Sequence, residues 1–361
     1  MSRPIFLNDN LPAPRTQRGI SRYFEKLEEG LAAEFPGQVA LCSATPANPY
    51  HFKFYPSLRF KGSYRFKLHD RIATLAARLE RPRVVYSDYF GEARVNAAEI
   101  FTIFDMIPEK IWLPQDNNRV NRRFVLEKQA CFARAAAILS ISENTARDFK
   151  TIYPTFAHKV VVTPLGVDTF FFEKSSEKTR DTGKPYFLYV GTRTPYKNFL
   201  TLLDAFGQSG LKADFNLQVI SPGSAAFSTE ETALLHKWRL ADSVELFCSV
   251  TDAELRCAYA GATAFVYPSK YEGFGLPILE AFASGTLVAT SNTSSMPEVG
   301  GEVAFYFDPL LPESLAATLK QLAALPRSTR QDRLAAGLAR ARTFSWERFQ
   351  KQTAAVFKEF V

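Results

Sequence analysis

The sequence is poor in residues that cross-link a chain or bind metals. Its four cysteines and four histidines are scattered along 361 residues, too few and too dispersed for a disulfide framework, a cysteine-based zinc site or a histidine-ligated metal. No apolar run approaches the ~20 residues of a membrane-spanning helix. The first residues also lack an apolar core of signal-peptide length. We therefore do not expect a secreted disulfide scaffold, an integral membrane protein or a zinc enzyme.

Two sequence motifs are missing as well. No Asp-x-Asp pair occurs, so a divalent cation that bridges a diphosphate is not indicated and no metal is expected. No Gly-x-Gly-x-x-Gly follows the first predicted strand of either half, which argues against a nicotinamide cofactor. The sequence therefore predicts a protein without a cofactor.

What is present is the composition of a soluble globular protein. Hydrophobic residues make up 46% and charged residues 22% of the chain, and there is no low-complexity tract. At roughly 150 residues per domain, this length predicts about two domains, each large enough to bury its own core.

Short apolar runs alternate with longer amphipathic stretches, which predicts an α/β protein with mostly parallel sheets. The strands predicted in the first half are Pro4–Leu7, Val39–Leu41, Val84–Ser87, Ile100–Ile103, Ala137–Ser140 and Val160–Val162. Those in the second half are Tyr186–Val190, Asn216–Ile220, Val244–Phe247, Ala264–Tyr267, Leu287–Ala289 and Ala304–Phe307. The intervening helices are predicted at Ile20–Glu34, His69–Leu79, Asn121–Arg134, Asn198–Phe206, Glu230–Trp238, Asp252–Ala260, Pro277–Ala283 and Pro312–Leu325.

A polar run within Asp168–Pro185 is the best candidate for a linker. We therefore predict two doubly wound Rossmann-like domains, residues 1–168 and 169–344, that face a cleft. Residues 345–361 are predicted to form an amphipathic helix capped by Ser345 that packs back on the first domain. The carboxyl ends of the strands in such domains are where ligands bind.

The net charge of +7 lies entirely in the first half. Residues 1–168 hold 24 Lys and Arg against 17 Asp and Glu, whereas residues 169–361 hold 20 of each. The stretch Lys53–Arg83 alone has nine basic and two acidic residues, interleaved with aromatics. It fits an anionic membrane surface or a lipid-linked diphosphate. A solvated helix face is the plainer interpretation, and no nucleic-acid motif accompanies the stretch. The candidates for an acceptor or membrane patch are Arg59, Lys61, Arg65 and Lys67.

The stretch Tyr267–Gly285 carries the clearest chemical signal. A buried strand leads into a loop with Gly273 and Gly275 and then into a helix opened by Pro277. Free N–H groups and the helix dipole at such a place suit a phosphate, and two carboxylates would flank it and bind hydroxyl groups. An ordinary strand–loop–helix with two solvated glutamates is the alternative. The amides concerned are those of Phe274, Gly275 and Leu276, and the carboxylates are Glu272 and Glu280.

The segment EGFGLPILE resembles the E-x7-E motif of the family 4 retaining glycosyltransferases (group 1), which have the two-domain GT-B fold. Nearly the whole chain shares this resemblance, because several weaker motifs follow in the family's order. These are RGISRYFEKL (18–27), FTIFDMIPE (101–109), AAAILSISENTARDF (135–149), VVTPLGVDTFFF (161–172), YVGTRTPYKNFLTLLDAF (189–206), VATSNTSSMPEVGGEVAFYFDP (288–309) and FSWERF (344–349).

The resemblance implies a hexosyltransferase that moves a sugar from a nucleotide-sugar donor to a glycan or lipid-linked acceptor in surface polysaccharide synthesis. Transfer would retain the anomeric configuration without a metal, and mannose or rhamnose are the sugars expected by analogy. The leaving phosphate would accept the acceptor's proton. We expect the chain in the cytoplasm. The basic stretch adds the hypothesis of peripheral attachment at the inner leaflet of the membrane, and the lack of a nucleic-acid motif predicts no nucleic-acid partner.

The resemblance also implies roles for individual residues. Lys197 neutralises the departing diphosphate, Glu272 binds the donor sugar, and Asp105 lies near the reacting centre; these three are the catalytic candidates. Glu280 binds the ribose, and the amides of 274–276 bind the diphosphate. The remaining donor-binding candidates are Gly19, Arg193 and, near the base, Leu255.

Three positions depart from the family pattern. Arg18 replaces a glycine of the first loop, and Phe104 replaces the histidine usual before Asp105. Tyr196 stands where an arginine is common, and Arg193 is either its substitute or a solvated loop charge. Two alternatives stay open. One is a GT-B-like sugar-nucleotide epimerase, which the four scattered histidines do not favour; the other, suggested by Arg18 and Phe104, is a catalytically silent nucleotide-sugar-binding partner subunit.

Overall fold

The computed structural model describes residues 4–9, 18–43, 52–56, 65–87, 93–173 and 183–361, with the side chains of 18 and 65–68 left out. It divides the chain into two compact units. Unit 1 consists of Met1–Gly166 and Trp346–Val361, and unit 2 of Val167–Ser345. The terminal segment therefore belongs to the same unit as the N-terminus. The cleft between the domains stays a prediction.

Unit 1 is built on a parallel sheet whose described strands follow the order β3-β2-β1-β4-β5-β6-β7. The jump from β1 to β4 is the point at which a doubly wound sheet reverses direction. The strands are β1 (Ile5–Asp9), β2 (Val39–Ser43), β3 (Lys53–Pro56), β4 (Val84–Ser87), β5 (Ala98–Ile103), β6 (Ala135–Ser140) and β7 (Val160–Val162).

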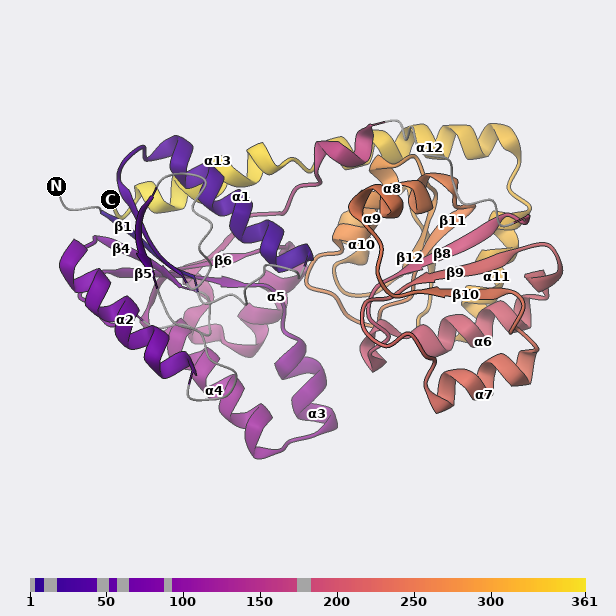
Figure 1. Ribbon diagram of the computed structural model, residues 1–361, viewed down its shortest axis with the longest axis horizontal. Helices are drawn as coiled ribbons and strands as arrows, with labels where there is room; N and C mark the ends of the chain where they lie inside the picture. The colour runs from indigo at the N-terminus through magenta and orange to yellow at the C-terminus, as the bar shows by residue number, and fades with distance from the viewer. Residues whose placement is uncertain (1–3, 10–17, 44–51, 57–64, 88–92, 174–182) are drawn as a thin grey trace. The chain divides into compact units, whose positions relative to one another are not determined.

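Helices cover both faces of this sheet (Figure 1). One face carries α1 (Arg18–Glu34) and α13 (Trp346–Lys358), and the other carries α2 (Arg65–Glu80), α4 (Arg119–Arg134) and α5 (Glu143–Ile152). The side chain of Gln350 on α13 donates to the carbonyl of Lys26 on α1 at 3.1 Å. Beside it, a Cβ at Gly30 would come within 2.8 Å of Gln350 Cβ, so only glycine allows this close approach.

The two faces of the unit 1 sheet are packed differently. Small side chains of α2, among them Ala73, Ala76 and Ala77, lie against Phe6 and other buried residues of the central strands. The opposite face is aromatic: the ring of Tyr23 on α1 makes edge-to-face contacts with Phe24, Phe104 and, on α13, Phe349. Aromatic packing of this kind explains why the terminal helix belongs to unit 1.

Unit 2 contains a second parallel sheet, with its described strands in the order β10-β9-β8-β11-β12-β13. Its direction reverses between β8 and β11. The strands are β8 (Tyr186–Val190), β9 (Asn216–Ile220), β10 (Val244–Phe247), β11 (Ala264–Tyr267), β12 (Val288–Ser291) and β13 (Phe305–Phe307). The helices are α6 (Phe199–Ser209), α7 (Thr229–Trp238), α8 (Asp252–Gly261), α9 (Leu276–Ala283), α10 (Met296–Gly300), α11 (Pro312–Ala323) and α12 (Arg327–Arg342).

The predicted α/β class with two doubly wound sheets is confirmed, but some elements differ from the prediction. Strand β3 lies in the basic stretch and pairs in parallel with β2. Its Lys53 forms an ion pair with buried Glu80 at the end of α2, so one charge of that stretch is neutralised internally. Helix α12 also escaped prediction, because only Gly337 and Ala341 of its 16 residues are buried and it lacks a wide apolar stripe.

Among the helices of the described residues, none combines the length and the apolar character needed to span a membrane.

Candidate functional site

The loop from β11 to α9 has the predicted strand–loop–helix form. Gly275 precedes the first residue of α9 and has a φ of +118°, a backbone conformation that would be strained in any residue with a side chain. Pro277 occupies the first turn. The N–H of Leu276, at the first helical position, has no acceptor within the helix by geometry, and the helix dipole favours an anion there. The local backbone is therefore suited to a phosphate.

Two predicted residues from different loops meet beside this helix. Lys197 ends the turn that follows β8, and Glu272 lies in the loop after β11; β8 and β11 are neighbours where the sheet reverses. Lys197 Nζ donates to Glu272 Oε1 at 2.7 Å and to Oε2 at 2.9 Å. Both side chains are mostly buried, with 16% and 11% of their surface exposed. Such a partly buried, bidentate pair is stronger than an exposed ion pair.

Tyrosines surround the ammonium group of Lys197. Its Nζ also donates to Tyr267 Oη at 3.2 Å, and it lies 5.4 Å and 5.5 Å from the ring centroids of Tyr267 and Tyr196. Burial, and secondly the nearby Glu272 carboxylate, hold the pKa of Tyr267 well above its usual value. The phenol therefore stays neutral, and Lys197 is the group that supplies positive charge at this place.

Two serines fix the backbone of the Glu272 loop. Ser294 Oγ donates to the Glu272 carbonyl at 2.7 Å and accepts from the Glu272 N–H at 3.2 Å. Ser295 Oγ donates to the carbonyls of Glu272, at 3.0 Å, and Phe274, at 2.6 Å. Sequence reasoning missed both serines. A run of polar residues directly after β12, the strand beside β11, was the signal that could have pointed to them.

The second carboxylate of the motif is buried inside unit 2. Glu280 lies on α9 with 8% of its surface exposed, and its Oε2 accepts from Tyr259 Oη at 3.2 Å. The alternative of two solvated glutamates is therefore wrong for both Glu272 and Glu280. Leu255 on α8 is buried as well, and Phe274 packs edge-to-face against Phe344.

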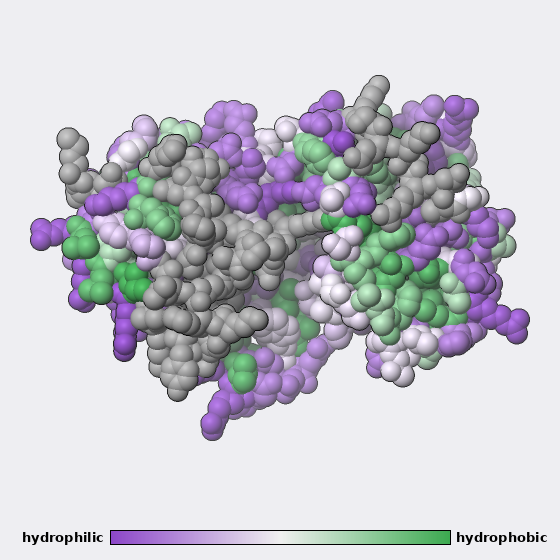
Figure 2. All heavy atoms as spheres, viewed as in Figure 1, coloured by the Kyte–Doolittle hydropathy of each residue, from purple (hydrophilic) through white to green (hydrophobic). Residues whose placement is uncertain are grey.

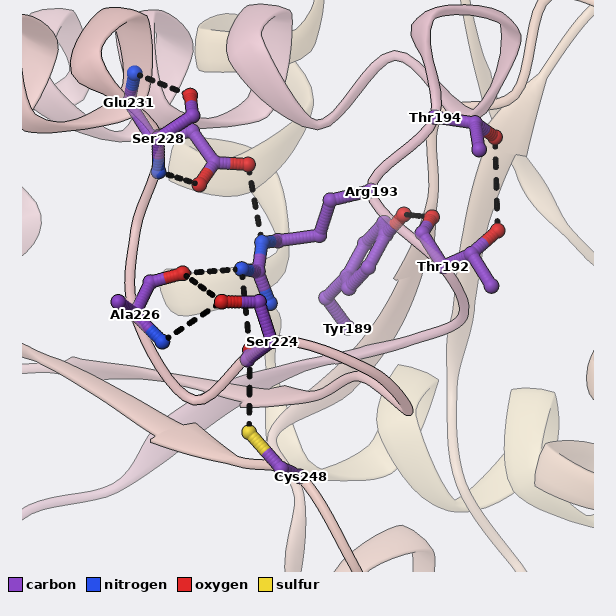
Figure 3. Close-up of polar contacts among 9 residues, drawn as sticks. All are labelled: Tyr189, Thr192, Arg193, Thr194, Ser224, Ala226, Ser228, Glu231 and Cys248. Atoms are coloured by element: carbon purple, nitrogen blue, oxygen red, sulfur yellow. Dashed lines mark hydrogen bonds and ion pairs between the residues drawn. The ribbon is translucent and has the colours of Figure 1, made fainter.

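Arg193 is not a solvated loop charge. Its Nε donates to Glu231 Oε1 at 2.9 Å, and its Nη2 donates to the carbonyls of Ser224, at 3.3 Å, and Ala226, at 2.7 Å (Figure 3). Glu231 also closes the capping box of α7 with Ser228. These groups line a pocket of about 430 Å³. Arg193 thus orders the loop after β9 in addition to any contact with a ligand.

The surface of unit 2 near these loops is weakly polar. In Figure 2, white and green residues gather over the part of unit 2 that Figure 1 labels α10, β8 and β9, whereas purple residues gather at its outer rim. Ligand sites commonly combine such an apolar surface with a few placed polar groups.

In unit 1, Asp105 is the second residue after β5, near the carboxyl edge of the sheet. Its Oδ1 accepts from the N–H of Ile107 at 2.9 Å. Its carbonyl accepts from Lys128 Nζ at 2.9 Å, and Lys128 also donates to Glu109 Oε2 at 3.1 Å. Tyr153 donates to the other oxygen of Glu109 at 3.0 Å.

Lys128 was missed by sequence reasoning, although its side chain is only 1% exposed. Its position on α4 carried a signal, because buried Cys131 and Phe132 follow it at spacings of three and four residues. Lys128 contacts Asp105 and Glu109, and this segment contains a π-helical turn, Pro108–Trp112.

The structure does not bring the other described residues predicted for unit 1 together. Phe104, in place of the family's histidine, is buried in the aromatic layer against Tyr23 at 4.9 Å between centroids. Gly19 is exposed near the start of α1. Arg59 and Lys61 lie outside the described residues, and for Arg65 and Lys67 only the helical backbone is described. The structure thus assembles Lys197, Glu272 and the start of α9 in unit 2.

We compared the chain with protein-family models, with known proteins and with solved structures. Residues 170–337 match the family model of the group 1 glycosyl transferases. The chain is 32% identical over 237 residues to O-antigen chain mannosyltransferase B of Escherichia coli, covering 62% of this chain and 61% of that protein. It is 30% identical over 227 residues to MMP alpha-(1->4)-mannosyltransferase of Mycolicibacterium hassiacum, covering 62% and 54%. The match thus spans between half and two thirds of these relatives.

Solved structures share the fold. Sucrose-phosphate synthase from Thermosynechococcus elongatus superposes with a TM-score of 0.82 at 18% identity, over 99% of this chain and 98% of that one. WaaG, described as a glycosyltransferase involved in lipopolysaccharide biosynthesis, gives 0.75 at 15% identity, over 98% of each chain. The fold is that of the GT-B glycosyltransferases. Residues 170–337, a little under half of the chain, are thus similar to the group 1 glycosyltransferases.

Proposed function

We propose that this protein is a retaining, metal-independent glycosyltransferase. It moves a sugar from a nucleotide-sugar to a glycan or lipid-linked acceptor in surface polysaccharide synthesis. The observation that carries the proposal is the pairing of Lys197 with Glu272 beside the N-terminal end of α9. This places a buried cation, a hydroxyl-binding carboxylate and helix N–H groups within one small site. A sugar diphosphate needs these three kinds of group.

The proposed chemistry follows from the charges. When the bond between the sugar and the diphosphate breaks, negative charge grows on the leaving oxygen. Lys197 and the N–H groups at the start of α9 stabilise that charge, and they are held in place before the reaction begins. Glu272 gives up its ion pair with Lys197 and accepts hydrogen bonds from hydroxyl groups of the donor sugar. Glu280 accepts hydrogen bonds from the ribose hydroxyls. In this proposal a divalent cation is not required.

Retention is assigned by analogy with the resembled family. The acceptor hydroxyl attacks from the same face that the diphosphate leaves, and the leaving phosphate takes the acceptor's proton. Asp105 positions the reacting groups from unit 1. Its carboxylate is oriented by the Ile107 N–H and its carbonyl by Lys128, so it is a fixed rather than a freely rotating group.

The names of the relatives support a mannose donor, because both curated relatives described above are mannosyltransferases. Rhamnose is the second sugar to test. The surplus positive charge of residues 1–168 supports a lipid-linked or membrane-bound acceptor at the inner leaflet.

The experiment is a thermal-shift screen with GDP-, UDP-, dTDP- and ADP-sugars, followed by a transfer assay with the best donor. We expect stabilisation by GDP-mannose or dTDP-rhamnose, transfer in the presence of EDTA, and a product with the donor's anomeric configuration by NMR. Lys197→Ala and Glu272→Gln should slow transfer by about 100-fold or more, whereas the exposed controls Lys320→Ala and Glu313→Gln should retain it. Binding without transfer would favour the silent partner subunit, and conversion of the donor sugar itself would favour the epimerase.

A further inference from the structure

Unit 1 contains a pocket of about 800 Å³ whose charge is mainly positive. Four arginines line it, together with one carboxylate. The charged residues are Arg78, Arg81, Arg94, Arg134 and Glu99. Among the described residues that line the pocket, four guanidinium groups and one carboxylate sum to a formal charge of +3. None of the residues that line this pocket takes part in the proposed transfer reaction.

The pocket lies at the amino edge of the unit 1 sheet. Arg78 and Arg81 come at the end of α2, just before β4; Arg94 precedes β5 and Arg134 precedes β6. Asp105 follows the opposite end of β5. A strand of this length spans roughly 20 Å, so the pocket is separate from the edge at which α/β sheets usually bind their ligands.

Glu99 neutralises only part of the charge. It accepts from Arg134 Nε at 3.4 Å, and Arg134 also donates to the Ala130 carbonyl at 3.2 Å. Within the described residues, Arg78 and Arg81 form no hydrogen bond or ion pair through their side chains. Close cations that lack counter-charges repel one another, and an anion between them would relieve this repulsion.

Arg81 has a backbone conformation that favours glycine. Its φ is +50°, and its N–H donates to the Ala77 carbonyl at 2.8 Å, which closes the C-terminus of α2. Glycine is the usual residue in such a cap. An arginine here accepts backbone strain and places a guanidinium group in the pocket.

We propose that this arginine pocket binds a ligand that carries two or more phosphate charges. Guanidinium groups bind phosphate oxygens through pairs of N–H donors, and several of them around one cavity select a multiply charged anion. The phosphate can belong to an anionic lipid headgroup or to a soluble diphosphate. Leu75 and Leu79, 61% and 75% exposed, lie on α2 next to Arg78, where they would contact acyl chains if the source is a lipid.

The test measures two sources of phosphate on the full chain carrying Lys197→Ala, which weakens the proposed donor site and keeps the two sites distinguishable. Inorganic pyrophosphate is titrated calorimetrically, and flotation compares vesicles of phosphatidylcholine with vesicles that contain 30% phosphatidylglycerol or 10% cardiolipin. Arg78→Ser with Arg81→Gly removes two pocket cations, and the glycine suits the φ of residue 81. The matched control is Arg119→Ser with Arg123→Ser, two exposed arginines on α4.

We expect the pocket variant to bind at least tenfold more weakly and the control to bind unchanged. Loss confined to anionic vesicles identifies a lipid source, and Leu75→Ser with Leu79→Ser should then weaken vesicle binding alone. Loss of pyrophosphate binding identifies a soluble source. If the pocket variant, shown to be folded by its melting temperature, binds both probes as the control does, or if neither probe binds the starting protein, the proposal is overturned.

Discussion

The arginines of helix α12 in unit 2 are held differently from Arg78 and Arg81 in unit 1. On α12, Arg330 donates to the carbonyl of Thr263 at 3.0 Å, Arg333 to the carbonyl of Glu302 at 2.6 Å, and Arg340 to the carbonyl of Val299 at 3.1 Å. In unit 1, Arg78 and Arg81 instead line a surface pocket and form no side-chain hydrogen bond or ion pair within the described residues. The excess of seven positive charges in residues 1–168 is therefore not spread evenly over that half of the chain. Part of it is concentrated where a ligand can reach it.

The largest expected effect concerns the buried charge of unit 1. Lys128→Met would leave the Glu109 carboxylate without its cation, and we expect it to lower the free energy of unfolding by about 3–5 kcal/mol. Urea denaturation measures this loss. Lys128→Met with Glu109→Gln should recover a large part of the loss, because the uncompensated charge is gone. A loss below about 1 kcal/mol for the single variant would show that this pair is no more important than an exposed one.

In unit 2, Lys197→Ala tests whether a buried cation serves the reaction. We expect kcat to fall roughly 100- to 1000-fold, since a fixed cation that stabilises developing charge contributes on this scale. A transfer assay with the donor found by the nucleotide-sugar screen measures the rate, and Lys320→Ala is the control. An unchanged kcat would contradict the role assigned to Lys197.

One pair of substitutions tests whether Arg340 in unit 2 and Arg78 in unit 1 differ in their contribution to stability. Arg340→Met loses the bonds to the carbonyls of Val299 and Glu298, so we expect a loss of about 1.5–3 kcal/mol. Arg78→Met has no such bond to lose and should change the free energy of unfolding by less than about 0.5 kcal/mol. Chemical denaturation of the two variants compares them directly. Equal losses would mean that the two units do not differ in this respect.

The smallest effect is a pH dependence in unit 1. Burial raises the pKa of Tyr23 to about 12, so folding favours the neutral phenol. The stability from this group is fully present below pH 10, the ordinary pKa, and is lost as the pH rises towards 12. Between pH 10 and 11 Tyr23 alone should lower the free energy of unfolding by about 1 kcal/mol. Tyr23→Phe should reduce the pH dependence by this amount; an equally steep slope in the variant would rule out a contribution from Tyr23.

Much of the fold follows from local pattern, because β-strands buried on both faces are continuous apolar runs. Tyr186–Val190 and Asn216–Ile220 form strands with the predicted bounds. Gly275 and Pro277 likewise mark the start of α9, since each has a backbone reason to be there. Helix α12 could not be predicted in this way. Arginine side chains attach it to backbone carbonyls, an interaction that hydrophobic periodicity does not register.

The candidate site was predictable only where a motif supplied it. Lys197 and Glu272 are 75 positions apart, and their contact depends on β8 and β11 being neighbours. Ser294, Ser295 and Lys128 act through backbone carbonyls, so their importance depends on distances that no local pattern contains. The arginine pocket similarly collects residues from the ends of three different elements.

The most direct test of the central claim, that unit 2 binds a nucleotide-sugar through the loops after β8 and β11, is hydrogen–deuterium exchange with and without the donor. We predict slower amide exchange in residues 189–200 and 267–285, and a smaller change in Lys197→Ala at the same donor concentration. Unchanged exchange in both segments at a donor concentration that supports transfer would contradict the account.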